Sequence, residues 1–358
     1  MTTSDYGYTV RPLTTLPGRG IALPPFIVED YDFRVKFDRI VLIIAPERSL
    51  SGTPTTSCSG IWMRFSKTGA KSVSVHELRP EPSVSHLQRF KVTIQDPIPV
   101  QLAAAREELR IAFGRETTDE VQELEIAFDL FPKNPHDEAA VSRAVQHVRR
   151  HFAPRVIQMD ADNTERLPRL QICKSTTLKL FQGFDDPPGF SLDEMPDQTF
   201  YIARSTKNGF FFKSYYKLVD RRGTKHERVL APEERCIRLE MTAAGSGVVD
   251  ICGGNTLDDL MRSRCRAAKR HFRFLLPVVP IDIDGATPFW NQLAAKRRGM
   301  VLKRWSEFGF SGELVGRYPP TTLKAGCRAD ETMQKAFHDA FSTLRWQLKK
   351  GAERLGHH

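Results

Sequence analysis

Hydrophobic and polar residues alternate along several short stretches of the chain, which is the period of a β-strand with one buried face. The clearest examples are KSVSVHEL (71–78), RFKVTIQD (89–96) and VQELEIAFDLF (121–131). Elsewhere apolar residues recur every three or four positions, as in an amphipathic helix, and PVQLAAAREELRIAFG (99–114) and DEAAVSRAVQHVRRHF (137–152) have this period. We therefore predict an α+β fold with an antiparallel sheet and flanking helices.

Further strands are predicted at 33–46, 60–66, 199–205, 209–219 and 235–244, with a loop at 47–60. The stretch FRVKFDRIVLIIAP (33–46) is almost wholly apolar in its second half, which predicts the interior of a sheet covered on both faces. Beyond about residue 254 the period becomes mostly helical, and helices are predicted at 256–276, 288–308 and 330–355.

These patterns predict three regions. Residues 1–27 are rich in Pro, Gly, Thr and Ser without periodicity, so we expect a flexible arm. Residues 28–254 form the predicted α+β region, and 255–358 a basic, mainly helical region. The beginning of the chain lacks the basic-then-apolar order of a signal peptide, and no stretch is long and apolar enough for a membrane span. We expect a cytoplasmic protein without a membrane partner.

Charge is concentrated in the last region. Residues 256–358 hold 19 Lys and Arg against 10 Asp and Glu, which accounts for most of the net charge of +10. Such an excess indicates a region that binds a polyanion, with nucleic acid the first candidate, although a solvated helical surface is the alternative. The candidate DNA-binding residues here are Arg266, Lys269, Arg270, Lys296, Arg297, Arg298, Lys303 and Arg304. Phe272, Phe274 and Trp305 lie among them, where they would stack on bases or pack between helices.

Two predicted strands carry acidic residues away from their apolar faces. In VQELEIAFDLF, Glu123, Glu125 and Asp129 point away from the apolar side, and in RCIRLEMTAA (235–244) Glu240 does so. Carboxylates from neighbouring strands commonly hold hard divalent cations, so one acidic residue of 121–131 and Glu240 could each supply a ligand for Mg²⁺ or Mn²⁺. The alternative is an ordinary solvated strand face.

The strand GFFFKSYYKLV (209–219) places Lys213, Tyr215 and Lys217 on one side and Tyr216 on the other. Neighbouring cations favour the phenolate of a tyrosine, and a metal ion polarises a phosphate under attack. Tyrosine and a carboxylate-held metal would suit transesterification of a DNA phosphodiester through a 5′-phosphotyrosine. A strand tyrosine can equally be a packing residue.

A resemblance to a known family rests on the same stretches. TFYIA (199–203), KSYYK (213–217) and RLE (238–240), preceded by ELEIAFD (123–129), resemble in order and spacing the signature block of the replication initiation factor family. Its members are tyrosine-dependent initiators of rolling-circle replication in plasmids and filamentous phages. The family patterns are T-x-Y-I-G, R-x-Y-D-K, R-x-E and R-x-D-x-A-x-D, so this chain departs from them at Ala203, Lys213, Tyr216, Glu123 and Glu125.

The resemblance implies a Rep/relaxase-like nicking domain in which Tyr215 is the nucleophile, with Tyr216 as the alternative. It also implies that Glu125, Asp129 and Glu240 are metal ligands. Lys217 and Arg238 would contact the scissile phosphate or its neighbours, and Lys213 is a further candidate for DNA binding. The expected partners are origin DNA, single-stranded or extruded as a hairpin, and a host helicase and polymerase, because the chain has no GxxxxGK[ST] loop of its own. A homodimer is a further expectation.

Other readings of the sequence remain open at this point. A relaxase for conjugative transfer or mobilisation uses the same bond chemistry, and a DNA-binding or RNA-binding protein would need no nucleophile. The chain has no His-hydrophobic-His pair of the kind that many related nicking enzymes use for metal. His147 and His151 lie four residues apart, but Arg149 and Arg150 between them disfavour a cation, so we expect helix surface there.

Overall fold

The computed structural model describes residues 9–15, 19–48, 54–67, 69–78, 88–154, 171–174, 177–180, 199–202, 209–222, 226–280 and 327–356. Its main feature is a nine-stranded sheet in which every neighbouring pair is antiparallel. In spatial order the strands are β4 (Ser72–Leu78), β5 (Arg89–Gln95), β3 (Tyr31–Ala45), β6 (Thr118–Pro132), β13 (Cys236–Ala244), β10 (Gly209–Lys217), β9 (Thr199–Ile202), β7 (Gln171–Lys174) and β8 (Thr177–Leu180). The predicted α+β class with an antiparallel sheet is confirmed.

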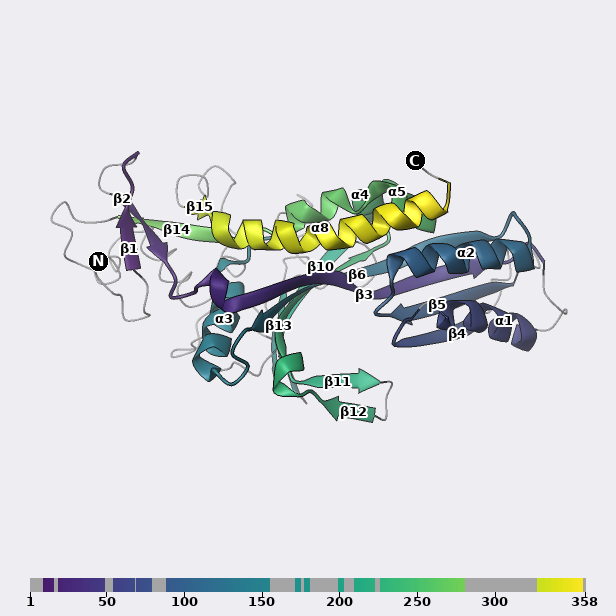
Figure 1. Ribbon diagram of the computed structural model, residues 1–358, viewed down its shortest axis with the longest axis horizontal. Helices are drawn as coiled ribbons and strands as arrows, with labels where there is room; N and C mark the ends of the chain where they lie inside the picture. Colours follow the sequence, from purple (N-terminus) through teal and green to yellow (C-terminus); the bar gives the residue numbers. More distant parts are fainter. Residues whose placement is uncertain are drawn as a thin grey trace.

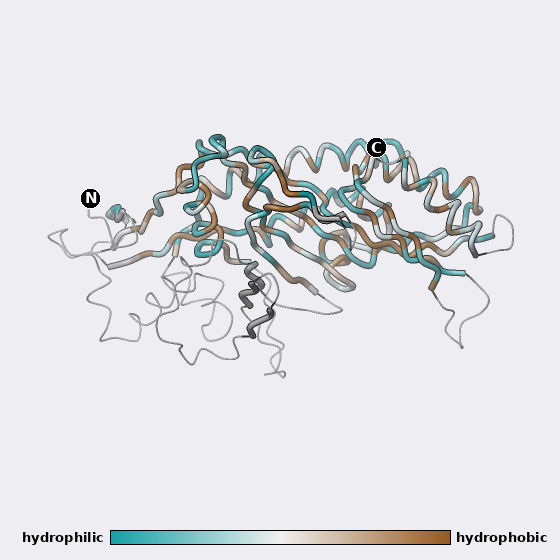
Figure 2. The backbone as a smooth tube through the Cα atoms, turned by 90° about the horizontal axis from the view of Figure 1, so that it is seen from below, coloured by the Kyte–Doolittle hydropathy of each residue, from teal (hydrophilic) through white to brown (hydrophobic). Residues whose placement is uncertain are grey.

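Helices pack against one face of this sheet and form one core with it. They are α1 (Pro54–Ser66), α2 (Pro99–Phe113), α3 (Glu138–His151), α4 (Ser246–Cys252), α5 (Leu257–Ser263) and α8 (Glu331–Arg354). The long helix α8 lies along the sheet, next to α2 and β3 (Figure 1). Leu124, Ile126 and Phe128 of β6 are fully buried in this core, as the alternation predicted. Coloured by hydropathy, the strands in the middle of the molecule show hydrophobic stretches interrupted by hydrophilic positions (Figure 2).

The second half of β3 is buried on both sides of the strand. Residues 40–44 include Ile40, Leu42 and Ile44 on one side and Val41 and Ile43 on the other, and none is more than 5% exposed. This burial agrees with the prediction from their continuous apolar character.

The prediction of a flexible arm is wrong where the first residues form strands. β1 (Thr9–Pro12) and β2 (Arg19–Leu23) join β14 (Leu275–Pro280) and β15 (Cys327–Ala329) in a four-stranded sheet. This second sheet lies at the opposite end of the molecule from α1 and α2 (Figure 1). A separate hairpin, β11 (Val219–Arg222) and β12 (His226–Val229), projects from the body directly after β10.

The expected boundary at residue 254 does not separate two cores. Leu257 and Leu260 of α5 and Phe337 and Phe341 of α8 belong to the same hydrophobic cluster as the strands. The single helix predicted over 256–276 is wrong. The chain forms α5, turns at Arg264 and Cys265, whose φ values are both positive, and continues as a 3₁₀ helix η5 (Arg266–His271) and then β14. The predicted helix at 288–308 lies outside the described residues.

The strand predicted at 60–66 is also wrong, because this stretch forms most of α1. Ile61 and Phe65 are fully buried, whereas Trp62 and Met63 are 48% and 52% exposed. Burial four residues apart is the period of a helix, and a seven-residue apolar run is too short for its period to be assigned. The loop predicted at 47–60 is wrong from Pro54 onward for the same reason.

His147 and His151 are buried rather than on the helix surface that we expected. Their rings stack with centroids 4.6 Å apart, and His147 Nε2 lies 3.2 Å from the carboxylate of Asp330. Nδ1 of His151 donates to the carbonyl oxygen of Leu275 at 2.6 Å.

No helix among the described residues is long and apolar enough to cross a membrane.

Candidate active site

The face of the sheet opposite the core carries a buried set of charged residues. On β6, Glu125 and Asp129 point away from Leu124 and Phe128, as predicted, yet they are only 2% and 1% exposed. An ordinary solvated strand face is therefore not what this part of the sheet forms. Buried carboxylates require partners, because removing an unpaired charge from water is costly.

Cross-strand register explains how these residues meet. Lys213 on β10 lies directly opposite Glu240 on β13, and Glu240 lies opposite Ala127 on β6. Ala127 has only a methyl group, so the space beside Glu240 is open to longer side chains from the neighbouring strands. One row further along, Tyr215 lies opposite Arg238, and Arg238 lies opposite Asp129.

A β-bulge in β3 adds a carboxylate that the sequence did not identify. The register between β3 and β6 shifts between Phe37 and Arg39, so Asp38 is the extra residue. Asp38 and Arg39 both contact residues of the charged face, where strict alternation would have turned one of them away. The only signal in the sequence was that Asp38 follows Lys36 on the polar side of a strand.

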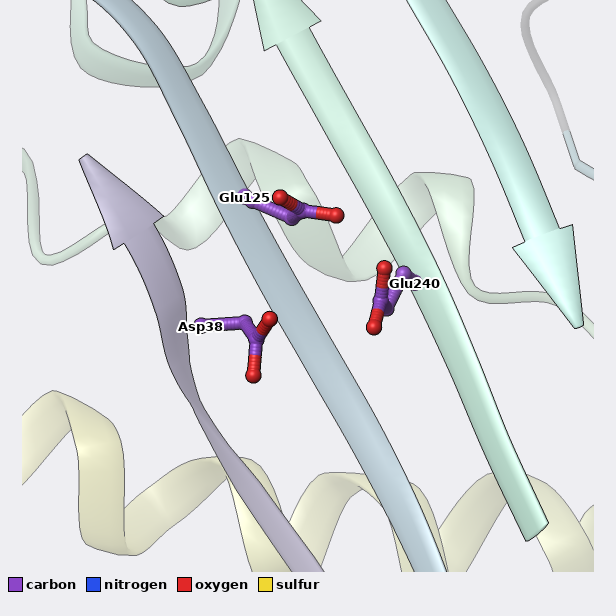
Figure 3. A group of neighbouring side chains, drawn as sticks. All are labelled: Asp38, Glu125 and Glu240. Atoms are coloured by element: carbon purple, nitrogen blue, oxygen red, sulfur yellow. The ribbon is translucent and has the colours of Figure 1, made fainter. Parts of the chain in front are cut away.

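Three carboxylates from three adjacent strands converge at this position. One carboxylate oxygen each of Asp38, Glu125 and Glu240 lie within 4.8 Å of one another. Figure 3 shows the three side chains extending from β3, β6 and β13 toward a common space. Of the predicted ligands, Glu125 and Glu240 lie together in this group, and its third carboxylate is Asp38 rather than Asp129.

Asp129 instead pairs with Arg238. Nε and Nη2 of Arg238 each donate to one oxygen of Asp129 at 2.6 Å, which is the bidentate geometry of a strong arginine–carboxylate pair. Nη1 of Arg238 donates to Asp38. The prediction that Arg238 contacts a DNA phosphate is not supported, because its side chain is only 3% exposed and donates to carboxylates through all three nitrogens.

Lys213 pairs with two of the three carboxylates. Its Nζ forms an ion pair with Glu125 Oε1 at 2.8 Å and a closer one with Glu240 Oε2. Both ion pairs lie within the protein, and the DNA contact of Lys213 stays a prediction. Arg39 lies on the other side of Glu125, with Nε 3.2 Å from Oε2, and also pairs with Glu123.

The ion pairs of this network leave an excess of negative charge. Five carboxylates are joined to three cations, which gives a formal charge of −2. The members are Asp38, Glu123, Glu125, Asp129, Glu240, Arg39, Lys213 and Arg238. Oxygen ligands of this kind fit Mg²⁺ or Mn²⁺, so the residues present suit the predicted metal.

Tyr215 lies at the edge of the three carboxylates. Its hydroxyl donates to Glu240 Oε1 at 2.5 Å. Burial raises the pKa of Tyr215 well above its usual value, and Arg238 only partly opposes this effect. The expectation that neighbouring cations favour the phenolate is therefore wrong for this environment, and Tyr215 is a neutral hydrogen-bond donor.

Tyr216 lies on the opposite face of β10. It packs against the hydrophobic core, and burial raises its pKa, with Arg235 opposing the shift. Lys217 returns to the charged face, 3.5 Å from Asp220, and Asp220 is also held by Lys71 at 3.0 Å. Burial and Arg238 lower the pKa of Lys217. Of the three predicted catalytic residues, only Tyr215 has a hydrogen bond to one of the three carboxylates, Glu240.

The predicted DNA-binding residues of the basic region do not gather here. Arg266, Lys269 and Arg270 lie in η5, which packs on the core side of the sheet, since the ring of its His271 lies tilted against that of Phe210 with centroids 4.2 Å apart. Phe272 and Phe274, the candidates for base stacking, are fully buried. The remaining candidates, Lys296, Arg297, Arg298, Lys303, Arg304 and Trp305, lie outside the described residues.

The chain matches no protein-family model, and no curated protein or solved structure is detectably similar to it. The geometry itself offers two chemical capacities. Three carboxylates on rigid central strands can hold a divalent cation, and a carboxylate hydrogen-bonded to a tyrosine hydroxyl can accept its proton.

Proposed function

We propose that this protein cleaves and rejoins a DNA strand by transesterification, with Tyr215 as the nucleophile, as an initiator of rolling-circle replication. The observation that carries the proposal is the hydrogen bond from the Tyr215 hydroxyl to Glu240, a member of the buried group formed with Asp38 and Glu125. A nucleophile beside its base, and the base beside further charged groups, is the usual arrangement for an activated hydroxyl.

Glu240 is the proposed general base. Because burial keeps Tyr215 protonated, attack requires that its proton be removed as the bond to phosphorus forms. Glu240 Oε1 takes this proton, the tyrosine oxygen bonds to phosphorus, and the bond from phosphorus to the 3′ oxygen breaks. The leaving 3′ oxygen takes a proton to give a 3′-hydroxyl that primes synthesis, and the 5′ end remains on Tyr215. The reverse attack by a 3′-hydroxyl rejoins a strand.

Asp38, Glu125 and Glu240 are the residues that would hold Mg²⁺ or Mn²⁺. When bound, such an ion polarises the phosphate and stabilises the charge that develops on its oxygens. The bidentate pair of Arg238 and Asp129 fixes the position of the Arg238 side chain. Arg238 in turn donates to Asp38, so the pair orients a candidate ligand and does not contact the DNA.

Origin DNA, single-stranded or extruded as a hairpin, remains the proposed substrate, with a host helicase and polymerase as partners and a homodimer as a possible assembly. Support comes from the resemblance of 199–203, 213–217 and 238–240 to the replication initiation factor family and from the basic residues after 255. A relaxase for conjugative transfer or mobilisation would use the same site and bond chemistry.

The test is a search for a covalent adduct. Labelled single-stranded DNA from the flanking region of the gene is incubated with protein and Mn²⁺, and the products are run on a denaturing gel before and after protease treatment. The wild type should form a protease-sensitive adduct, and Tyr215→Phe should form none while still binding DNA. Tyr216→Phe is the matched control, because it removes the adjacent hydroxyl from the other face of the same strand.

A second candidate is a DNA-binding protein without catalysis. The observation that favours it is the ammonium of Lys213, which already pairs with Glu125 and Glu240. DNA binding that needs no metal, with no adduct on any fragment, would support this candidate and exclude the first. An adduct lost only in Tyr216→Phe would support transesterification through a tyrosine but exclude Tyr215 as the nucleophile.

A further inference from the structure

We propose that Lys213 is an exchangeable cation that occupies the metal position until DNA binds, so that the metal enters the site only after the substrate. This inference rests on the proposed function. It concerns the order of binding, which the proposed chemistry leaves open.

The ammonium of Lys213 lies against two of the three carboxylates that would bind the ion. It contacts Glu125 Oε1 and Glu240 Oε2, which belong to two of the three converging carboxylates. Both oxygens are buried, and neither accepts a geometrically good hydrogen bond from any described residue. Their charge is therefore balanced at this point by the ion pair with Lys213.

A divalent ion and this ammonium cannot both occupy the position. Oxygen ligands lie roughly 2.0–2.6 Å from Mg²⁺ or Ca²⁺, so an ion bound by Asp38, Glu125 and Glu240 would fill the space between them. The ammonium would then lie against a like charge in a buried environment, where repulsion is weakly screened. Metal binding therefore requires Lys213 to move.

Lys213 is able to move, whereas Arg238 is fixed. Its side chain is 24% exposed and ends on a flexible four-carbon stem. Arg238 is 3% exposed and is held through both of its bonds to Asp129. Lys213 Nζ also lies 5.8 Å from the ring centroid of Tyr215, so the ammonium and the nucleophile share one neighbourhood.

A DNA phosphate positioned for attack by Tyr215 would be within reach of Lys213. The phosphate is an anion that competes with Glu125 and Glu240 for the ammonium, and lysine is a common phosphate ligand. Once Lys213 turns to the phosphate, Arg39 and Arg238 remain as the cations of the network, and its formal charge changes from −2 to −3. The metal then binds to the site and to the substrate together, which limits metal-dependent chemistry to the DNA-bound protein.

The test measures Mn²⁺ binding rather than cleavage. Free Mn²⁺ is followed by its electron paramagnetic resonance signal in the wild type, Lys213→Met and Lys36→Met, each with and without single-stranded oligothymidylate. Lys36→Met is the matched control, because Lys36 is on the same face of the adjacent part of the sheet but pairs with Asp96 and not with the three carboxylates. Thermal unfolding by circular dichroism checks that each variant is folded.

The wild type should bind Mn²⁺ weakly alone and about tenfold more tightly with the oligonucleotide, a difference that corresponds to about 1.4 kcal/mol. Lys213→Met should bind Mn²⁺ about tenfold more tightly than the wild type without DNA, and the oligonucleotide should add little. Lys36→Met should behave as the wild type does. If Lys213→Met does not fold, Lys213→Ala is measured in its place, with the same result expected.

Equal Mn²⁺ affinity in the wild type and Lys213→Met overturns the exchange. So does a wild type that binds Mn²⁺ with the same affinity with and without the oligonucleotide. Glu240→Gln should lose Mn²⁺ binding in every condition, which shows that the measured site is the carboxylate group. If no variant binds Mn²⁺, the exchange is also wrong. Because the adduct test with Tyr215→Phe is independent of this titration, failure of the exchange and failure of the proposed function are distinguishable.

Discussion

Asp129 and Glu125 lie four residues apart on one face of β6, but their neighbours give them different roles. Asp129 neutralises the buried guanidinium of Arg238, whereas Glu125 is a member of the group with Asp38 and Glu240. Two acidic residues that look alike in the sequence therefore differ in role, because Asp129 is structural and Glu125 is a candidate ligand.

This difference makes a prediction about Asp129→Asn and Glu125→Gln. Asp129→Asn leaves Arg238 with Asp38 as its main remaining counter-charge, so the free energy of unfolding should fall by roughly 3 kcal/mol, as expected when one partner of a buried pair is removed. Glu125→Gln should weaken Mn²⁺ binding far more than Asp129→Asn does. Urea denaturation and Mn²⁺ titration of both variants check this, and a larger loss of Mn²⁺ binding in Asp129→Asn would return Asp129 to the ligand set.

The sequence predicted which side of each strand the charged residues occupy, but it did not predict which of them meet. Alternation correctly placed Glu125, Asp129, Glu240 and Tyr215 on the polar side of their strands. Distances across the sheet depend on register, which alternation does not specify, so the pairing of Asp129 with Arg238 was not predicted. Asp38 was missed because a bulge is a departure from alternation.

At the scale of elements, α4 approaches the start of β10 so closely that a side chain has no room. A Cβ on Gly247 would lie 2.3 Å from the backbone oxygen of Gly209. Because that oxygen belongs to the backbone, either the helix or the strand that carries Tyr215 would have to move.

We expect Gly247→Ala to lower the free energy of unfolding by about 1–3 kcal/mol, the usual cost of overpacking. Gly351→Ala in α8 is the matched control. Its Cβ would lie 2.7 Å from the sulfur of Met261, a flexible side chain that can shift, and alanine favours the helix. Thermal unfolding of both variants tests the contact, and an equal effect of the two substitutions would show that the approach of α4 to β10 is not limiting.

Elements with a long, clear period were predicted well, and short or broken ones were not. β6, α2 and α8 have the expected type and similar bounds, because each keeps one period over many residues. In α1 the seven predicted strand residues were too few to show their helical period. The turn at Arg264 requires two residues with positive φ, for which neither Arg nor Cys is a signal.

At the scale of the whole molecule, a buried histidine pair joins three distant parts of the chain. His147 and His151 belong to α3, Leu275 to β14, and Asp330 precedes α8 and caps it by accepting from the backbone of Met333. Charge in this cluster therefore affects the attachment of the C-terminal helix to the rest of the fold.

Burial and the neighbouring His147 lower the pKa of His151 well below the ordinary 6.5, while Asp330 opposes the shift and Arg150 adds to it. The unfolded chain consequently binds this proton more readily than the folded protein does. The effect of His151 on the free energy of unfolding is most favourable above about pH 6.5. Below that pH the free energy of unfolding falls by up to about 1.4 kcal/mol per pH unit, because the unfolded chain takes up the proton. Burial would raise the pKa of Asp330, but hydrogen bonds from His147 and Met333 lower it below 3.8, so Asp330 stays charged throughout this window.

The free energy of unfolding, measured with urea at pH 7.5 and at pH 5.5, should therefore decrease at the lower pH. His151→Gln should make this decrease smaller, because glutamine does not titrate and its amide can still donate toward Leu275. His136→Gln is the control, since His136 is exposed, and it should keep the wild-type pH dependence. If His151→Gln and His136→Gln lost stability equally between the two pH values, the histidine pair would not be the origin of the acid sensitivity, and the attachment of α8 would have to depend on other groups.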